Sequence, residues 1–188
     1  MKLFFRIFLV AVFTLTGAAS ASAQTKEFLE AFNMVKHLVE LPNSRAYKGI
    51  ELGHYPGEML RSMGLKDNNG VLNRLQVIYQ VKIPYGNENR SYANATYHRF
   101  TSLVHINQKP KLYEQIMCQT TKEQEFSLYK AIRKKNNQPS EFIVLIKNAE
   151  KAIVCDVVGY ITVQDVLKML SPDLKNYVKE DTLSISNK

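Results

Sequence analysis

The chain has no tryptophan, only two cysteines, and only six prolines and eight glycines among its 188 residues. So little proline and glycine excludes a collagen-like or low-complexity chain. Hydrophobic residues make up 45% of the sequence, which is normal for a globular protein and too much for a disordered one. Neither an internal repeat nor a shift in composition divides the chain, so we expect a single domain.

Long hydrophobic runs are also scarce, and the clearest one lies near the start. Two basic residues precede an apolar run from Ile7 to Leu15, and the small residues Ala21-Ser22-Ala23 follow it. This is the pattern of a cleavable signal peptide over residues 1–23. The alternative, an uncleaved membrane anchor, is less consistent with the sequence because a spanning helix needs roughly 20 apolar residues.

The mature chain should therefore start at Gln24, after cleavage at Ala23. No cysteine follows the apolar run, so the sequence offers no site for a lipid anchor. No later stretch approaches membrane-spanning length. We expect a soluble protein that is exported to the periplasm or the extracellular medium, with no membrane span after cleavage.

Acidic residues are fewer than basic ones, with 17 Asp and Glu against 25 Lys and Arg, a formal net charge of +8. In an intracellular chain this balance would suggest nucleic acid as a partner, but an exported chain meets little of it. The only basic cluster, Arg133-Lys134-Lys135, is typical of a solvated hairpin end or, alternatively, of a contact with anionic lipid or polysaccharide. We expect an envelope protein or an anionic surface as partner, and no nucleic acid.

Periodicity predicts the secondary structure. Apolar residues recur at helical spacing over residues 25–40, and residues 92–106 fit a helix better than a strand. Residues 71–83 alternate apolar and polar, which predicts one long strand with a solvated face and a bulge near Asn73. Thr162 and Asp165 have the spacing of a reciprocal cap that opens a last helix. A meander of four strands is predicted at residues 112–119, 125–134, 142–146 and 152–158.

These elements together predict an α+β fold. We expect a single antiparallel sheet of about five to six strands with helices mainly on one face. The domain should span residues 24–178, and residues 179–188 should form a flexible C-terminal tail because they are polar and terminal.

Much of the chain resembles a known family, most specifically near its C-terminal end. The apolar hairpin Glu141–Ile146 and Ala152–Val154, the segment Gly159-Tyr160-Ile161 and the start of the last helix at Asp165-Val166-Leu167 carry the resemblance. They are similar to a family of small exported bacterial proteins that is classed as a domain of unknown function. The resemblance covers most of residues 45–170. It implies an α+β fold and an exported location, and it implies no known activity.

A polar segment with several tyrosines is the best candidate for a binding surface. The chain has ten tyrosines, and three of them lie in or beside residues 84–97, together with Arg90 and several asparagines. Tyrosine provides contact area at low entropic cost, and arginine is common at interfaces. The alternative is that these tyrosines fold back onto the core. The candidate binding residues are Tyr85, Arg90, Tyr92 and Tyr97.

Catalytic motifs are absent from the sequence. No Gly-x-Ser-x-Gly pattern appears, and no phosphate-binding loop with its lysine. His98 and His105 could share one helix face, but seven residues is too wide for a pair of metal ligands one turn apart. We expect no cofactor, no metal and a non-enzymatic binding module. The alternative is an envelope hydrolase with its site near His98 and His105.

The two cysteines raise the question of a disulfide. Cys118 and Cys155 fall in the first and fourth strands of the predicted meander. Strands three spacings apart are roughly 14 Å apart at about 4.8 Å each, whereas a disulfide needs Cα atoms within about 7 Å. We therefore expect two free thiols, although export favours a bridge and another strand order would permit one.

Overall fold

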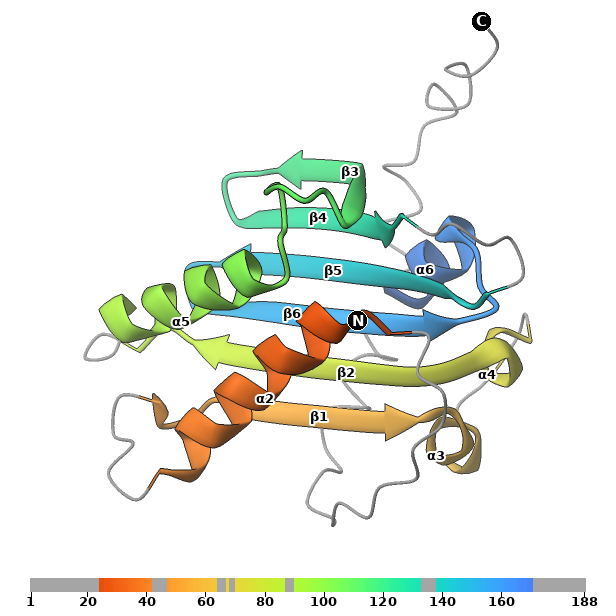
Figure 1. The fold of residues 1–188 in the computed structure, drawn as a ribbon, viewed down its shortest axis with the longest axis horizontal. Coiled ribbons are helices and arrows are strands. Elements are labelled where there is room, and N and C mark those ends of the chain that lie inside the picture. The colour runs from red at the N-terminus through yellow and green to blue at the C-terminus, as the bar shows by residue number, and fades with distance from the viewer. Residues whose placement is uncertain are drawn as a thin grey trace, which may run out of the picture.

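The computed structural model describes residues 24–41, 47–63, 67, 70–86, 90–132 and 138–170. Within them, six strands form one antiparallel sheet in the order β1-β2-β6-β5-β4-β3 (Figure 1). This confirms the predicted α+β class and the single antiparallel sheet. The strands are β1 (Glu51–Pro56), β2 (Leu75–Pro84), β3 (Tyr113–Thr120), β4 (Gln124–Ala131), β5 (Ser140–Asn148) and β6 (Lys151–Gly159). The helices are α2 (Lys26–Glu40), α3 (Gly57–Ser62), α4 (Val71–Arg74), α5 (Arg90–Leu103) and α6 (Val163–Leu170).

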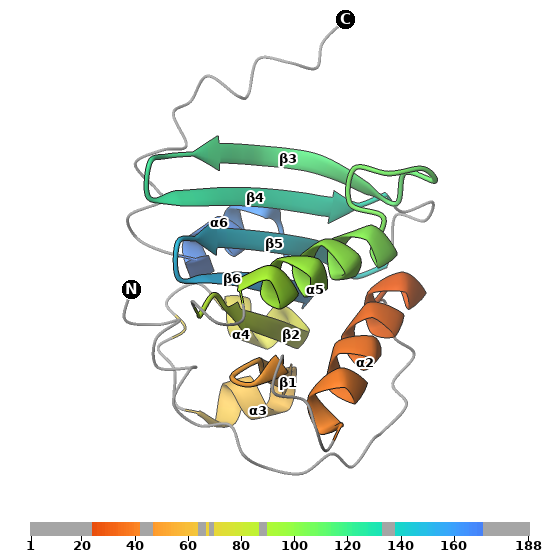
Figure 2. The same ribbon diagram turned by 90° about the vertical axis from the view of Figure 1, so that its left-hand side faces the viewer.

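Helices cover both faces of the sheet. The two longest, α2 and α5, share one face, which we call the front face, and the shorter α3, α4 and α6 lie on the rear face (Figure 2). Each face has its own cluster of buried apolar side chains. On β5, for example, Ile143 and Leu145 belong to the front cluster while Phe142 and Val144 belong to the rear cluster. The continuous apolar runs of β5 and β6 are explained by this burial on both sides.

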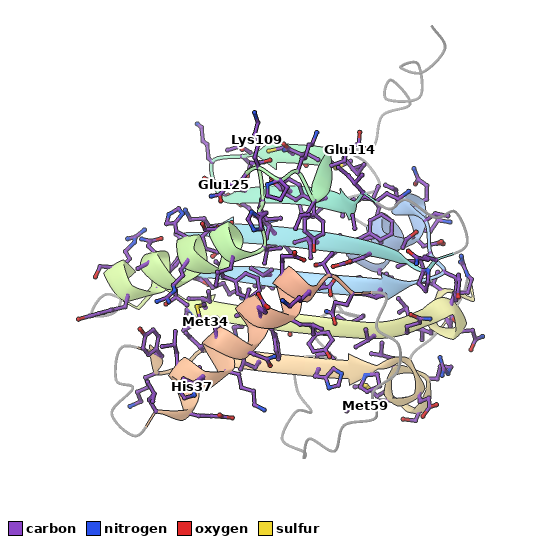
Figure 3. All side chains as sticks on the ribbon, viewed as in Figure 1. Met34, His37, Met59, Lys109, Glu114 and Glu125 are labelled. Atoms are coloured by element: carbon purple, nitrogen blue, oxygen red, sulfur yellow. The ribbon has the colours of Figure 1, made fainter. Side chains whose placement is uncertain are left out.

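The front core is built around α2. Its buried residues are spaced like one stripe of a helix: Phe28, Ala31, Phe32 and Val35. Phe28 packs edge-on against Phe100 of α5, with the ring centroids 5.5 Å apart. Figure 3 shows that α2 crosses the sheet, with Met34 and His37 towards the end of the helix that lies over β1. The prediction of a helix over residues 25–40 is therefore confirmed.

The long strand predicted at residues 71–83 is only partly correct. Residues 71–74 form the short helix α4, because the Asp67 carboxylate accepts hydrogen bonds from Val71 N at 2.8 Å and from Leu72 N at 3.0 Å. Strand β2 then begins at Leu75. Its predicted solvated face is also wrong, since Gln80 is 7% exposed and its amide donates to the Cys155 Sγ. The alternating pattern did not reveal that the rear helices cover this side.

The cap of α6 is confirmed, and it also joins α6 to β2. Thr162 N donates to Asp165 Oδ2 at 2.9 Å, and Asp165 N donates to Thr162 Oγ1 at 3.2 Å. Arg74, the last residue of α4 and directly before β2, adds two bonds of 3.0 Å to the two oxygens of the same carboxylate. Burial alone would raise the pKa of Asp165, but the hydrogen bonds from Arg74 and Thr162 outweigh it and lower the pKa below its usual value.

This lowered pKa predicts an acid-sensitive contribution to stability. Asp165 should stabilise the fold at pH values above its unfolded pKa of about 3.9, and this stability should be lost as the pH falls through the lower pKa of the folded state. We expect Asp165→Asn to lower the free energy of unfolding by about 1–2 kcal/mol at pH 7, measured by urea unfolding. The gap to the wild type should shrink below pH 4. Glu30→Gln, which removes an exposed ion pair with Lys26, is the control and should change little.

Gly159, at the end of β6, pairs with Leu75 at the start of β2 in a place with no room for a side chain. A Cβ atom at this position would lie 2.4 Å from the Arg74 carbonyl oxygen and 2.9 Å from the Leu75 Cα. The same carbonyl accepts a hydrogen bond from Tyr160 N at 2.9 Å, so it cannot move away without losing that bond. Glycine is therefore required here by space.

We expect Gly159→Ala to destabilise the protein by about 1–3 kcal/mol, because the added methyl group overpacks a backbone contact. Gly86→Ala is the matched control, since no atom lies within 4 Å of a Cβ at Gly86. The control should be neutral within about 0.5 kcal/mol or slightly stabilising. Equal melting temperatures for the two variants would contradict the close approach.

The two cysteines are free, as predicted from the strand order. Strands β4 and β5 lie between β3, which carries Cys118, and β6, which carries Cys155. Cys118 is exposed, whereas Cys155 is buried in the rear core. Burial raises the pKa of Cys155 to about 12, so its thiol stays protonated and behaves as a small apolar group.

Several predictions fall on residues outside the described part of the chain. These are the signal peptide at 1–23, the basic cluster at 133–135 and the tail at 179–188. Among the described residues, no helix is both long and apolar enough to cross a membrane.

Candidate functional site

Two acidic side chains are completely buried beneath the start of α2. Glu141 of β5 and Asp156 of β6 each have 0% of their surface exposed. In the strand register Glu141 pairs with Val158 and Ile143 pairs with Asp156, so the two acidic residues are diagonal neighbours on the front face. We call Glu141 and Asp156 the carboxylate pair.

The first described residues of the chain bind this carboxylate pair. Thr25 N donates to both oxygens of Glu141 at 3.1 Å, and Thr25 Oγ1 donates to Oε1 at 3.0 Å. Tyr113 OH donates to the same oxygen at 2.8 Å and also forms a hydrogen bond with Thr25 Oγ1. The side-chain amide of Gln24 donates to Asp156 Oδ2. Residues more than 100 positions apart in the sequence are thus joined by one hydrogen-bond network.

Local structure explains why the donors converge. Thr25 is the N-cap of α2 and its backbone is extended, with φ −68° and ψ 143°, so its own N–H points away from the helix. The positive end of the helix dipole favours a negative charge at this place. Tyr113 of the edge strand β3 pairs with Ala131 of β4, and its hydroxyl reaches Glu141 on the next strand, β5.

The pKa values of two tyrosines beside the carboxylate pair are raised. Burial raises the pKa of the Tyr113 hydroxyl far above its usual value, and the negative charge of Glu141 raises it further. The pKa of Tyr79, which pairs with Asp156 across β2 and β6, is raised by burial and then by Asp156. Both phenols therefore stay neutral hydrogen-bond donors at physiological pH. The two carboxylates are suited to accept hydrogen bonds from N–H and O–H groups. Most of the donors that they have are in residues 24 and 25.

We expect Tyr113→Phe to lower the free energy of unfolding by about 2 kcal/mol, because it removes a hydrogen bond to a buried charged group. Tyr129→Phe is the matched control, since Tyr129 is also buried and its hydroxyl accepts a bond of 3.0 Å from the neutral amide of Asn107. The control should lose about 1 kcal/mol. Urea unfolding measures both, and a loss for Tyr113→Phe no larger than that of the control would contradict a stronger hydrogen bond from Tyr113 to Glu141.

The four residues predicted to bind a partner fall into two groups. Tyr85 is 8% exposed and belongs to the front core, and Tyr97 packs against the same core. Burial is the main cause that raises the pKa of Tyr97 to about 12, and the Lys147 ammonium lies 5.7 Å from its ring centroid. Arg90 and Tyr92 are instead exposed on the first turn of α5. The structure thus brings the four side chains to α5 and the end of β2 but leaves two of them on the surface.

The outer side of α5 is basic. The exposed positions of this helix recur every three or four residues and carry Arg90, Tyr92, His98 and Arg99, and no Asp or Glu occurs within it. Tyr92 is 54% exposed and Leu103 is 39% exposed. Glu125, at the start of β4, lies beside the helix (Figure 3), and its register partner on β5 is Lys147. This surface therefore combines positive charge with exposed aromatic and aliphatic side chains.

The two histidines predicted as a possible hydrolase site lie in different surroundings. His98 is on the exposed side of α5, whereas His105 follows the helix, is half-buried and has a left-handed φ of 56°. The buried Nδ1 of His105 has no hydrogen-bond partner. In the described part of the chain, no three His, Cys, Asp or Glu side chains are grouped so that they could hold a metal ion.

The sequence analysis did not identify the carboxylate pair. A signal was present, because Asp156 interrupts the apolar run from Ala152 to Val158 and Glu141 directly precedes the apolar run of β5. An acidic residue inside a strand buried on both faces must have hydrogen-bond donors nearby. The donors themselves could not be inferred, because they come from residues 24–25 at the other end of the chain.

Searches of protein-family models, curated proteins and solved structures find no match to this chain. The resemblance to a family of exported proteins therefore stays a prediction from the sequence.

Proposed function

We propose that the protein is exported to the cell envelope and acts there as a non-enzymatic binding module, with the outer side of α5 as its contact surface and an anionic surface as its partner. The observation that supports this most directly is the charge of α5. The helix exposes Arg90, His98 and Arg99 and contains no acidic side chain.

The aromatic and aliphatic side chains on the same side favour a contact surface over a merely solvated helix. Tyr92, Arg99 and Leu103 lie on one stripe of the helix, at spacings of seven and four residues. Arginine and tyrosine are enriched in interfaces, where they supply charge-assisted bonds and a large contact area. The inner side of the helix holds the surface in place through Ala93 and Phe100, which are buried in the front core.

The chemistry of the remaining polar groups supports binding rather than catalysis. The most deeply buried acids, Glu141 and Asp156, are bonded to residues 24 and 25 at the start of α2. No carboxylate of the described residues is bonded to His98 or His105, so neither imidazole has the orienting partner that a general base requires. The export step itself is supported by the leader pattern of residues 1–23.

We expect the double variant Arg90→Ala/Arg99→Ala, made in the mature chain, to bind vesicles that contain phosphatidylglycerol about 30-fold more weakly than the wild type. Each arginine near an anionic surface contributes about 1 kcal/mol, and about 1.4 kcal/mol corresponds to a factor of ten. Co-sedimentation at fixed salt concentration measures the binding, and the melting temperature should stay nearly unchanged because both side chains are exposed.

The control variant Lys26→Ala/Lys48→Ala removes the same charge from exposed positions outside α5. It should retain most of the binding. If the control loses as much binding as the α5 variant, net charge rather than this surface is responsible. Equal binding of the wild type to phosphatidylglycerol and phosphatidylcholine vesicles would contradict an anionic partner.

A further inference from the structure

We propose that the carboxylate pair, Glu141 and Asp156, is a binding site for the α-ammonium group that signal-peptide cleavage creates at Gln24. This inference rests on the export and cleavage proposed above. It assigns the buried acids a role in maturation: they bind the new end of the chain and thereby stabilise the processed form over its precursor.

The contacts of Gln24 and Thr25 bring the amino end of Gln24 to the carboxylate pair. The side chain of Gln24 donates to Asp156, and the next backbone nitrogen, that of Thr25, lies 3.1 Å from each oxygen of Glu141. The nitrogen of Gln24 is joined to that of Thr25 through only the Cα and the carbonyl carbon of Gln24, so it is covalently next to the group that binds Glu141. Gln24 itself is 9% exposed.

Cleavage changes the chemistry of this nitrogen. A signal peptidase hydrolyses the peptide bond between residues 23 and 24, so that the hydroxyl of water goes to the carboxyl carbon of Ala23 and a proton goes to the nitrogen of Gln24. A neutral amide with one N–H becomes an amine with a pKa of about 8, which is an ammonium ion with three N–H donors at neutral pH. The reaction therefore places a positive charge beside two carboxylates that are fully buried.

The charge balance favours this ammonium ion. Burying a carboxylate is costly unless it is paired, and a hydrogen bond between ammonium and carboxylate is stronger than one from a neutral amide. The positive end of the α2 dipole opposes a cation at this place, but it corresponds to only about half a charge, less than that of one carboxylate. Hydrogen bonds from Thr25 and Tyr113 already hold Glu141 in position, so the site needs little rearrangement.

The decisive experiment compares two folded chains that differ by one residue. One starts at Gln24 and the other keeps Ala23, so that its ammonium group is displaced by one residue and Gln24 keeps an amide nitrogen. Both are released from a fusion by a protease that leaves no extra residue, and mass spectrometry checks that Gln24 has not cyclised. We expect the Gln24 chain to melt about 5 °C higher. Equal melting temperatures would overturn the proposal.

The carboxylate dependence is tested with Asp156→Asn in both chains. If the ammonium group binds the carboxylate pair, the difference in melting temperature between the two termini should largely disappear in this background. If the full difference in melting temperature persists in Asp156→Asn, another part of the molecule is responsible for it, and the proposal is wrong. A variant at a contact that does not involve the terminus, Tyr129→Phe, should leave the difference intact.

A second measurement does not need these variants to fold. In the chain that starts at Gln24, the folded α-amine should react with an acylating reagent at pH 7 about tenfold more slowly than it does in urea, as expected for a pKa raised by about one unit. In the chain that keeps Ala23, the terminal amine should show a smaller difference. An α-amine equally reactive in the folded and unfolded states would overturn the proposal.

Sequencing the exported protein separates this inference from the function on which it rests. An exported chain that begins at another residue leaves the export proposal standing and overturns the maturation role of the carboxylate pair. An uncleaved chain overturns cleavage, and the recombinant Gln24 chain then still reports whether the pair binds an ammonium group.

Discussion

Two buried carboxylates determine where the first helix lies, and through it how the front core is formed. Glu141 and Asp156 sit in the two strands at the centre of the apolar sheet, where an acidic group is tolerated only among hydrogen-bond donors. Those donors come from residues 24 and 25 and from Tyr113 of the edge strand. The start of α2, strand β3 and the centre of the sheet are therefore held in one arrangement, and Phe28, one turn into α2, is brought against Phe100 of α5.

The two sides of α5 differ in burial and in charge. The inner side of α5 is buried against α2 and the sheet, so a change there would affect folding. Its outer side contributes little burial and carries the positive charge. On the rear face, a separate pair of hydrogen bonds joins the end of α4 to the turn before α6. The Arg74 guanidinium donates to the Tyr160 carbonyl, and Tyr160 N donates to the Arg74 carbonyl.

Local patterns in the sequence were sufficient for most of the fold. The helix at residues 26–40, the meander and the cap formed by Thr162 and Asp165 all depend on neighbours within a few positions, and each is found. The single strand expected at residues 71–83 is wrong at its start because the Asp67 side chain caps a turn of helix instead. The carboxylate pair was not predicted from the sequence for a related reason. Its partners are 116 and 132 residues away, and periodicity carries no information at that range.

The sequence also predicted the placement of the candidate binding residues only in part. Composition singled out Tyr85, Arg90, Tyr92 and Tyr97 as a group, and they do lie at α5 and the adjoining end of β2. Which of them face outward depends on the exact helical phase and on how α5 lies on the sheet. Both are determined by packing with α2, so Tyr85 and Tyr97 became core residues while Arg90 and Tyr92 remained on the surface.

The strand order also has a consequence for the time course of folding. Among the described residues, β6 is the last strand in sequence order, yet it lies between β2 and β5 and pairs with both. Until residue 159 has been synthesised, the β1–β2 pair and the β3–β4–β5 part of the sheet lack the strand that pairs with both of them. Neither apolar face of the sheet can be completed before then. Closure of the sheet requires contacts between distant parts of the chain, which form slowly because loop-closure entropy opposes them. A growing or truncated chain that ends before β6 therefore lacks the centre of its own sheet.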